Sequence, residues 1–180
     1  MSIAGGDLNS ALDAGGAYFS AIVFDACLMQ TIETVYQVHE YADYVIGSPE
    51  LVPGTGQPYD DVFSALQNPY TAEEAVATIC EKYAESYSAG GSQNSGSSDW
   101  ETPISAIKTQ AFVAWEEAFR ILCAALQQAC SQHPALFHEA REECHVYYRN
   151  QIDLVNLLEM IEDDPNLMDL ASVIDYFWQK

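Results

Sequence analysis

The chain has few basic side chains, and this shortage limits what it can bind. Its 180 residues contain six Lys and Arg against 27 Asp and Glu, which gives a formal net charge of −21. A surface of this sign repels nucleic-acid phosphates and the headgroups of anionic membranes, so neither is an expected partner. Cationic peptides would be attracted, although most of these acids are expected to form solvated, solubilising faces.

Several sequence signals are absent as well. The five cysteines are odd in number and include no Cys-x-x-Cys pair, so neither a zinc site nor a disulfide framework is indicated. There is no Gly-x-Gly-x-x-Gly and no Gly-Lys-Ser/Thr sequence, which argues against a nucleotide site. No apolar stretch reaches the roughly 20 residues that cross a bilayer. The start of the chain lacks the basic and apolar regions of a signal peptide, so an export signal would have to lie upstream.

What is present is a strand, a helix and a second strand in close succession. Residues 17–24 are apolar on both faces and predict a strand in the interior of a parallel sheet. Residues 28–41 repeat apolar side chains at helical spacing, and residues 43–48 predict the next strand. This βαβ unit predicts an α/β fold with a parallel strand pair.

Further elements follow. The pattern predicts a helix over 60–67 with Phe63 inward, and a second helix that opens at a capping box, Thr71–Glu74. Residues 90–98 are rich in Gly and Ser and predict a flexible surface loop or linker, after which 103–107 predict a strand.

From Gln110 the chain is predominantly helical. Cys123 and Cys130 lie seven residues apart on one helix face and are expected to pack in the core. Residues 150–158 and 166–177 predict two more helices.

Asp25 and Cys27 lie where the first strand gives way to its helix. In α/β sheets, catalytic and binding groups gather beyond the carboxyl ends of the strands. The N-terminus of the following helix would favour the thiolate of Cys27. A Pro/Gly-rich loop, residues 48–59, leaves the second strand and should bring Glu50 to the same edge. Alternatively, Cys27 is only a small buried side chain.

A cysteine nucleophile needs a general base, and here the sequence offers little. None of the four histidines, at positions 39, 133, 138 and 145, follows the end of a predicted strand. His138 and Glu142 are spaced as a helical i, i+4 pair, but a metal site would need a third ligand. The residues alone leave a thiol enzyme and a non-catalytic acidic domain equally open.

Three stretches carry a specific resemblance to a known family. They are Ile22-Val23-Phe24-Asp25-Ala26-Cys27-Leu28-Met29, the run from Tyr41 to Glu50 that ends in Ser-Pro-Glu, and Gly54-Thr55-Gly56-Gln57-Pro58-Tyr59-Asp60. Together they resemble the clostripain family of cysteine peptidases over residues 17 to about 110. Residues 110–180 match only in helical character.

The resemblance implies a fold and an activity. The fold would be a caspase- and gingipain-like three-layer α/β/α sandwich, here with an incomplete sheet and a helical C-terminal region. Residues 1–110 would be the cysteine-bearing part of the peptidase domain, and residues 111–180 its helical extension. The activity would be endopeptidase cleavage after Arg or Lys, and the protein would be secreted or belong to the cell envelope.

The resemblance also implies roles for individual residues. Cys27 matches the nucleophile, Asp25 matches the acid that lines the specificity pocket, and Glu50 is a second, weaker candidate for that pocket. No cofactor is expected; some family members depend on calcium, but no calcium site can be assigned to residues of this chain.

One departure from the family concerns the catalytic histidine. In the family it lies in a His-Gly motif on a strand before the cysteine, and none of the 26 residues before Cys27 is histidine. Family members are often cleaved between the two residues, so the chain is expected to be either a processed heavy chain or a truncated reading frame, and Met1 favours truncation. Its expected partners are peptide substrates with basic residues and the missing histidine-bearing segment or light chain. Alone, it is expected to have negligible peptidase activity.

A second hypothesis is that the protein is an inactive peptidase homologue. In that case Asp25 and the glycine-containing loop would bind basic peptides without cleaving them. A histidine-bearing strand in the upstream coding sequence would favour the enzyme, and a native start at Met1 would favour the binding domain.

Overall fold

A three-stranded sheet carries the first part of the chain in the computed structural model, which describes residues 5–67, 71–149 and 151–180. The described residues divide into two compact units, 1–110 and 111–180. The predicted α/β fold with an incomplete sheet and a helical C-terminal region is confirmed.

The sheet of the first unit has the order β1-β2-β3. Strand β1 (Phe19–Val23) pairs in parallel with β2 (Ala42–Gly47), with Ala21 opposite Tyr44. Strand β3 (Ser105–Lys108) pairs antiparallel with β2. The predicted βαβ unit and the later strand are therefore present.

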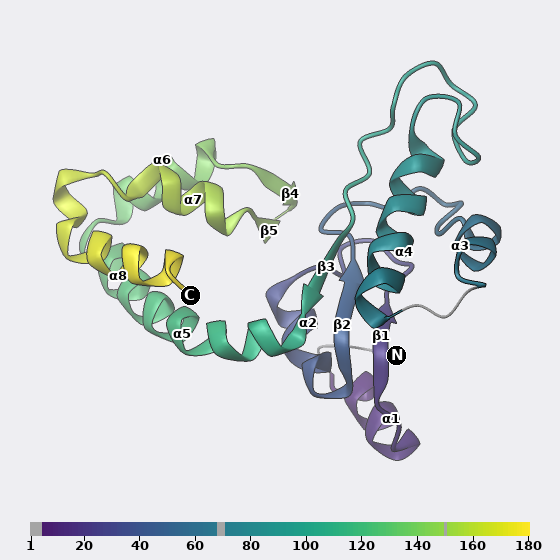
Figure 1. The fold of residues 1–180 in the computed structure, drawn as a ribbon. Coiled ribbons are helices and arrows are strands. Elements are labelled where there is room, and N and C mark those ends of the chain that lie inside the picture. Colours follow the sequence, from purple (N-terminus) through teal and green to yellow (C-terminus); the bar gives the residue numbers. More distant parts are fainter. Residues whose placement is uncertain (1–4, 68–70, 150) are drawn as a thin grey trace. The chain divides into compact units, whose positions relative to one another are not determined.

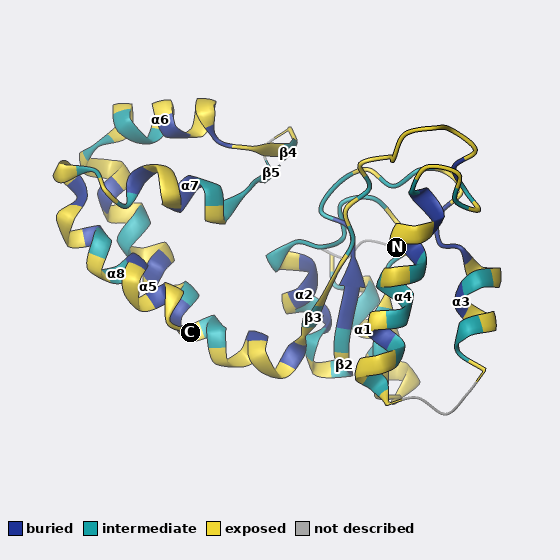
Figure 2. Ribbon diagram, turned by 45° about the horizontal axis from the view of Figure 1, so that its top comes forward, coloured by how far each residue is buried: buried dark blue, intermediate teal, exposed yellow. Residues whose placement is uncertain are grey.

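Helices cover this sheet on both sides. Helix α2 (Ile32–Val38) and a 3₁₀ turn (His39–Tyr41) connect β1 to β2, and helix α4 (Ala72–Tyr87) contacts all three strands. The strands lie between α2 and α4 in both ribbon views (Figures 1 and 2). The remaining helices of the unit are α1 (Asp7–Gly15) and α3 (Tyr59–Ala65).

The core of the first unit is centred on β2. Val45 and Ile46 of this strand are fully buried, as are Val35 and Val38 of α2. Helix α4 adds Tyr83 and Tyr87 from the other side, and it begins at the predicted capping box of Thr71 and Glu74. Strand β2 is buried along most of its length in Figure 2, which fits the apolar side chains of Tyr44, Val45 and Ile46, whereas Asp43 near its start is exposed.

Strand β1 departs from its prediction. It was expected in the interior of a sheet, but it pairs only with β2 among the described strands, and its residues are half-buried or exposed. Tyr18, Phe19 and Val23 remain 63%, 41% and 38% exposed. These apolar side chains are therefore not buried by any described part of the chain, although the sequence predicts their burial.

Other expectations about side chains are also wrong. Phe63 is 65% exposed on α3 rather than directed inward, although Val62 beside it is buried. Cys123 and Cys130 are exposed, because the buried stripe of their helix passes through Leu122 and Ala129 instead. A seven-residue spacing fixes a shared helix face but not which face is buried.

The second unit is mostly helical. It contains most of α5 (Thr109–Gln132), α6 (Pro134–Glu143), α7 (Leu154–Ile161), a 3₁₀ turn (Pro165–Leu167) and α8 (Met168–Trp178). Its core joins α5, α7 and α8, with Leu122, Leu158 and Ile174 almost fully buried. Residues 150–158 were expected to form one helix; instead β4 (Val146–Tyr148) and β5 (Gln151–Ile152) form a hairpin before α7. Residue 150 lies outside the described residues.

Candidate active site

The segment after β1 runs beside the loop after β2. The N–H of Phe24 donates to the carbonyl of Ile46 at 2.8 Å, that of Leu28 to Glu50 at 3.0 Å, and that of Gln30 to Ser48 at 3.0 Å. The structure thus brings Asp25, Cys27 and residues 48–59 together at the carboxyl end of the sheet, as the sequence predicts.

Cys27 is held by the backbone of this second loop. Its Sγ is half-buried and lies 3.2 Å from the N–H of Val52, from which it accepts, and 3.7 Å from the Val52 carbonyl. The expectation that the N-terminus of the following helix lies directly after Cys27 is wrong, because α2 begins only at Ile32 with Thr31 as its N-cap. The sulfur is therefore fixed by a loop contact and not by a helix terminus.

The backbone turns sharply just after the cysteine. Leu28 has φ of 62°, a left-handed conformation that is uncommon for residues other than glycine. Such strained residues gather at functional sites, where neighbouring structure enforces them. The Leu28 N–H is used by Glu50, whereas that of Cys27 donates to no carbonyl among the described residues. The turn leaves the Cys27 N–H available to a bound oxygen.

Asp25 is exposed, and two groups of the neighbouring loop define its position. Tyr59 donates from its hydroxyl to Asp25 Oδ2 at 2.7 Å. This hydrogen bond, followed by burial and the charge of Asp25, raises the pKa of Tyr59 above its usual value. Gly56 packs so tightly that a Cβ there would lie 2.6 Å from both carboxylate oxygens. Asp25 therefore presents a carboxylate whose location is fixed while one oxygen, Oδ1, accepts no hydrogen bond from a described residue.

Tyr83 lies behind the same stretch. It is 1% exposed on α4, and its ring meets Tyr87 edge-on with 4.9 Å between centroids. Burial, followed by the neighbouring Tyr87 and the charges of Asp25 and Cys27, raises the pKa of Tyr83 to about 12. The phenol is therefore protonated, and uncharged, at physiological pH.

Of the other candidates, Glu50 reaches the site through its backbone. Its carbonyl accepts from Leu28 and from the Ser48 hydroxyl, and its N–H donates to the same hydroxyl. The histidines are not brought to Cys27 by any hydrogen bond of the described residues. His39 bonds to the Tyr36 carbonyl, and the other three histidines belong to the second unit.

Sequence reasoning passed over three polar residues that contact this site or its loop: Tyr59, Tyr87 and Gln93. Tyr59 carried a signal, since it is the one tyrosine of the Pro/Gly-rich loop and ends it. Tyr87 and Gln93 carried none, because only the packing of α4 and the following loop brings them near Gly56.

Within the described part of the chain, no three His, Cys, Asp or Glu side chains come together as metal ligands would. No described helix combines the length and the apolar character needed to cross a bilayer.

The chain matches the model of the clostripain family over residues 2–174. No curated protein sequence matched it significantly.

Solved structures resemble the chain as well. A secreted C11 cysteine protease from Bacteroides thetaiotaomicron, in complex with an irreversible peptide inhibitor, is 27% identical, with a TM-score of 0.61. The match covers 98% of this chain and 47% of that one. An inactive zymogen C11 protease from Parabacteroides distasonis is 21% identical with a TM-score of 0.57, and the match covers 94% and 46%.

A third structure is a clostripain from Bacteroides thetaiotaomicron ATCC 29148 in complex with the peptide inhibitor BTN-VLTK-AOMK. It is 18% identical with a TM-score of 0.58, and the match covers 98% of this chain and 72% of that one. The chain thus spans about half the length of two of these proteins and nearly three quarters of the third.

Proposed function

The chain belongs to the clostripain family of cysteine peptidases, and on this premise we propose that it is the cysteine-bearing part of an endopeptidase that cleaves after Arg or Lys. The observation that carries the proposal is the pairing of Cys27, held by Val52 beside a strained turn, with the exposed carboxylate of Asp25 at one sheet edge. It places a thiol, for nucleophilic attack, two residues from a carboxylate that could bind a basic substrate side chain.

Cys27 would act as the nucleophile. Its thiolate would attack the scissile carbonyl carbon, the bond to the leaving amine would break with protonation of the nitrogen, and water would hydrolyse the acyl-enzyme. The free N–H of Cys27 would stabilise the oxyanion that develops during attack.

Asp25 would select the basic side chain. Oδ2 is engaged by Tyr59, while Oδ1 is available to accept a charge-assisted hydrogen bond from Arg or Lys. The peptide inhibitor of one similar structure, VLTK, ends in Lys, which supports this specificity. Glu50 is a weaker candidate for the same pocket, supported by its backbone attachment beside Cys27.

The general base would be a histidine from an upstream segment or a separate light chain. Two features support this: the chain spans 47% and 46% of two similar proteases, and β1 has an edge that pairs with no described strand. We therefore expect negligible activity from the chain alone. Secretion or attachment to the cell envelope is also proposed, since one similar protease is described as secreted.

The nucleophile is tested in the full-length protein with Cys27→Ala. Cleavage of Arg and Lys reporter peptides should be abolished, because the oxyanion contact cannot replace the nucleophile. Cys80→Ala is the matched control, since this half-buried thiol lies on α4 and is expected to leave the rate unchanged. Cleavage that persists in Cys27→Ala would refute the assignment.

The selector is tested with Asp25→Asn, which preserves the shape of the side chain. The variant should show a much higher KM for Arg and Lys reporters, because the cationic side chain of the substrate would lose its counter-charge. Full-length wild-type protein that binds basic peptides but cleaves none would instead favour the inactive homologue.

A further inference from the structure

The Asp25 carboxylate depends on a tyrosine that opens the next helix. Tyr59 is the first residue of α3, and its hydroxyl donates to Asp25 Oδ2 at 2.7 Å. Its ring stacks on Phe63 one turn later, with 6.1 Å between centroids. The donor is therefore fixed by the helix rather than by a mobile loop side chain.

Gly56 forms the other support of Asp25. Its φ of 64° suits glycine, and a methyl group there would collide with both carboxylate oxygens. Its N–H donates to the Pro53 carbonyl at 2.9 Å, and its own carbonyl accepts twice, from the Tyr87 hydroxyl at 2.7 Å and from Gln93 Nε2 at 2.9 Å. The backbone that touches Asp25 is thus tied to the end of α4.

Tyr87 is itself immobilised. It is 1% exposed, stacks on Trp100 with 5.8 Å between centroids and shares its hydroxyl with Thr55 Oγ1 at 2.7 Å. The Tyr87 hydroxyl, at the end of α4, and the Gln93 amide, in the loop that follows, both donate to the Gly56 carbonyl. These two bonds restrict where residues 55–56 can lie. The site is therefore supported from α4 as well as from α3.

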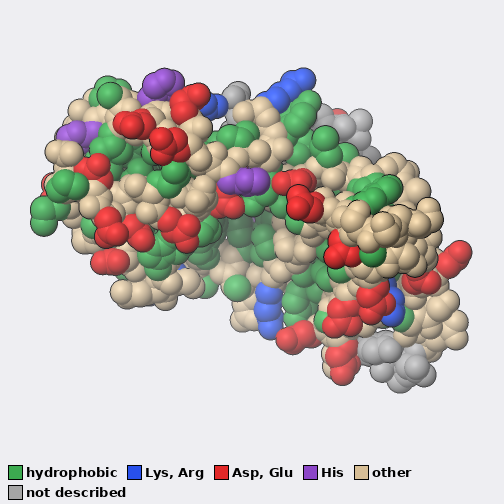
Figure 3. All heavy atoms as spheres, turned by 90° about the horizontal axis from the view of Figure 1, so that it is seen from above, with side chains coloured by type: hydrophobic (Ala, Val, Ile, Leu, Met, Phe, Trp, Pro, Cys, Tyr) green, Lys and Arg blue, Asp and Glu red, His purple; other side chains and the backbone are tan. Residues whose placement is uncertain are grey.

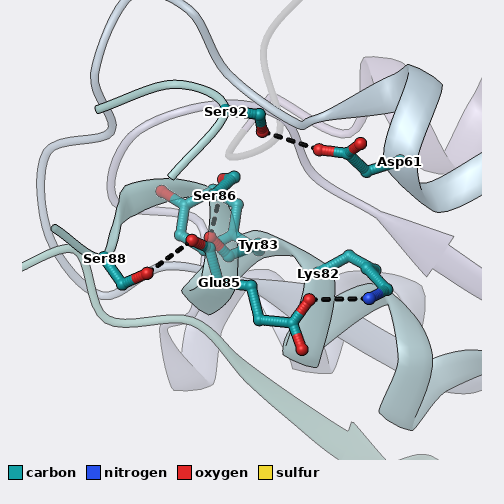
Figure 4. Close-up of polar contacts among 7 residues, drawn as sticks. All are labelled: Asp61, Lys82, Tyr83, Glu85, Ser86, Ser88 and Ser92. Carbon is teal, nitrogen blue, oxygen red and sulfur yellow. Dashed lines mark hydrogen bonds and ion pairs between the residues drawn. The ribbon is translucent and has the colours of Figure 1, made fainter. Parts of the chain in front are cut away.

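Hydrogen bonds also anchor the loop that carries Gln93, the segment predicted as a flexible surface loop or linker. Asn94 is 1% exposed, and its side-chain amide donates to the carbonyls of Tyr87 and Ser98, both at 2.8 Å. The N–H of Gln93 donates to Ser86 at 3.0 Å. In Figure 4, Ser92 turns toward Asp61 of α3, with which it forms a 2.6 Å hydrogen bond.

An open pocket is lined by residues of α3, α4 and this loop. It has a volume of about 520 Å³ and is lined by polar side chains that mostly bond to one another. Ser92 bonds to Asp61, Lys82 to Glu85 at 2.6 Å, and Ser86 to the Tyr83 carbonyl at 2.7 Å (Figure 4). The first bond ties the loop to α3, and the other two lie within α4, on the helix that also holds the Gly56 carbonyl through Tyr87.

We propose that Tyr59 and Tyr87 are positioning residues for substrate selection: Tyr59 orients the Asp25 carboxylate directly, and Tyr87 with Gln93 holds Gly56 against it. The proposal rests on the proposed function, in which Asp25 receives the basic side chain of the substrate. Neither tyrosine touches the reacting bond, so their loss should weaken binding of basic substrates more than it slows chemistry.

The test uses the full-length protein and a pair of reporter peptides that carry Arg or its neutral isostere citrulline at the cleavage position. For Tyr59→Phe, the Arg-over-citrulline ratio of kcat/KM should fall about ten-fold, the effect of a lost hydrogen bond to a charged group, mainly through KM. Tyr87→Phe should act in the same direction. Active-site titration of Cys27 and thermal unfolding correct both variants for the fraction of folded protein.

Tyr41→Phe is the matched control. Tyr41 donates to Asp13 Oδ1 at 2.8 Å, so the variant also removes one tyrosine–aspartate hydrogen bond, but one outside the site. Its ratio should equal that of the wild type. Tyr59→Phe is the more informative of the two tyrosine variants, because it is expected to fold normally: Tyr59 is 51% exposed, and removal of its hydroxyl leaves the packing of the ring intact.

Two outcomes separate the proposals. If Asp25→Asn abolishes the preference for Arg while both tyrosine variants behave like Tyr41→Phe, the positioning role is refuted and the proposed function stands. If Asp25→Asn leaves the preference unchanged, the specificity pocket itself is refuted, and the positioning role with it.

Discussion

At the scale of single residues, the site is defined by contacts rather than by residue types. Cys27 is one of five free thiols, and what distinguishes it is the Val52 N–H 3.2 Å from its sulfur and the left-handed Leu28 that follows. Asp25 is one of many acids, and what distinguishes it is Tyr59 and the close approach of Gly56. Local geometry therefore separates these two residues from chemically identical ones elsewhere.

The hydrogen bond between Tyr59 and Asp25 predicts a titration. The pKa of Tyr59 is raised from 10.0 chiefly because its hydroxyl donates to Asp25. The folded state thus favours the protonated phenol, and the resulting stability is full below pH 10.0 and lost as the pH rises through the folded pKa. In Asp25→Asn, the titration of Tyr59 should move back toward 10.0.

The measurement is ultraviolet absorbance against pH, with Tyr59 isolated by subtracting the spectra of Tyr59→Phe variants. Asp43→Asn is the control, because it removes the acceptor of Tyr18 instead. If the pKa of Tyr59 is the same in Asp25→Asn as in the wild type, the hydrogen bond between Tyr59 and Asp25 is refuted.

At the scale of elements, hydrogen-bonding side chains determine where several helices begin. Thr31 caps α2, Thr71 and Glu74 form the capping box of α4, and Asp153 caps α7. Helix α2 starts four residues later than the apolar repeat suggests, because the backbone N–H groups of Leu28 and Gln30 donate to the carbonyls of Glu50 and Ser48 instead. These backbone hydrogen bonds join residues far apart in the sequence, so the local sequence around residues 28–31 gives no sign of them.

Asp153 gives a prediction for the second unit. It accepts from the Asn156 N–H at 3.0 Å and from the Tyr147 hydroxyl at 2.7 Å, so it joins the start of α7 to the hairpin. Asp153→Ala should lower the free energy of unfolding by about 1 kcal/mol, the typical effect of a lost N-cap. Chemical denaturation of this variant and the wild type measures the difference.

The same residue makes this difference depend on pH. Burial acts to raise the pKa of Asp153, but the bonds from Asn156 and Tyr147 outweigh it and hold the pKa below 3.8. The stabilisation is therefore full above pH 3.8 and lost as the pH falls through the folded pKa, so the variant and the wild type should converge in acid. Asp163→Ala, an exposed neighbour on the same unit, should show no such change.

At the scale of the whole molecule, the two units differ in completeness. The second has a closed core of α5, α7 and α8. The first has a strand whose outer edge pairs with no described residue and whose apolar side chains are exposed. Acidic side chains are spread over both units on the face shown in Figure 3, in line with the net charge of −21. Such charge promotes solubility, and an exposed apolar strand edge works against it.

This asymmetry predicts where the proposed upstream segment attaches. Phe19→Lys should weaken its association with β1 and reduce reporter cleavage by the full-length protein, because a charge would replace an apolar side chain meant for burial. Co-purification of the separately tagged segment measures association. Met168→Lys is the control, since Met168 is 75% exposed on α8 in the second unit. Equal loss in both variants would contradict attachment at β1.

The sequence by itself determined the order of elements in the first unit and the residues at its sheet edge. Alternating blocks of apolar residues identified β1, α2 and β2, and turn residues identified the loop that returns to Cys27, because these signals are local. The family resemblance rested on the same stretches. The helix predicted over residues 150–158 begins only at Leu154, because Gln151 and Ile152 pair with β4; a short apolar run suits a helix or a strand until packing decides.

Only the tertiary structure decided which residues surround Asp25 and Cys27. Tyr87 and Gln93 lie more than 30 residues from Gly56 along the chain, and nothing in their neighbourhood marks them as partners of its carbonyl. The sequence also could not show that β1 is exposed. Two apolar faces indicate that a strand is suited to burial, but not whether the chain supplies the elements that bury it. Sequence periodicity records local conformation, whereas the support of a site is a sum of long-range contacts that only the folded chain brings together.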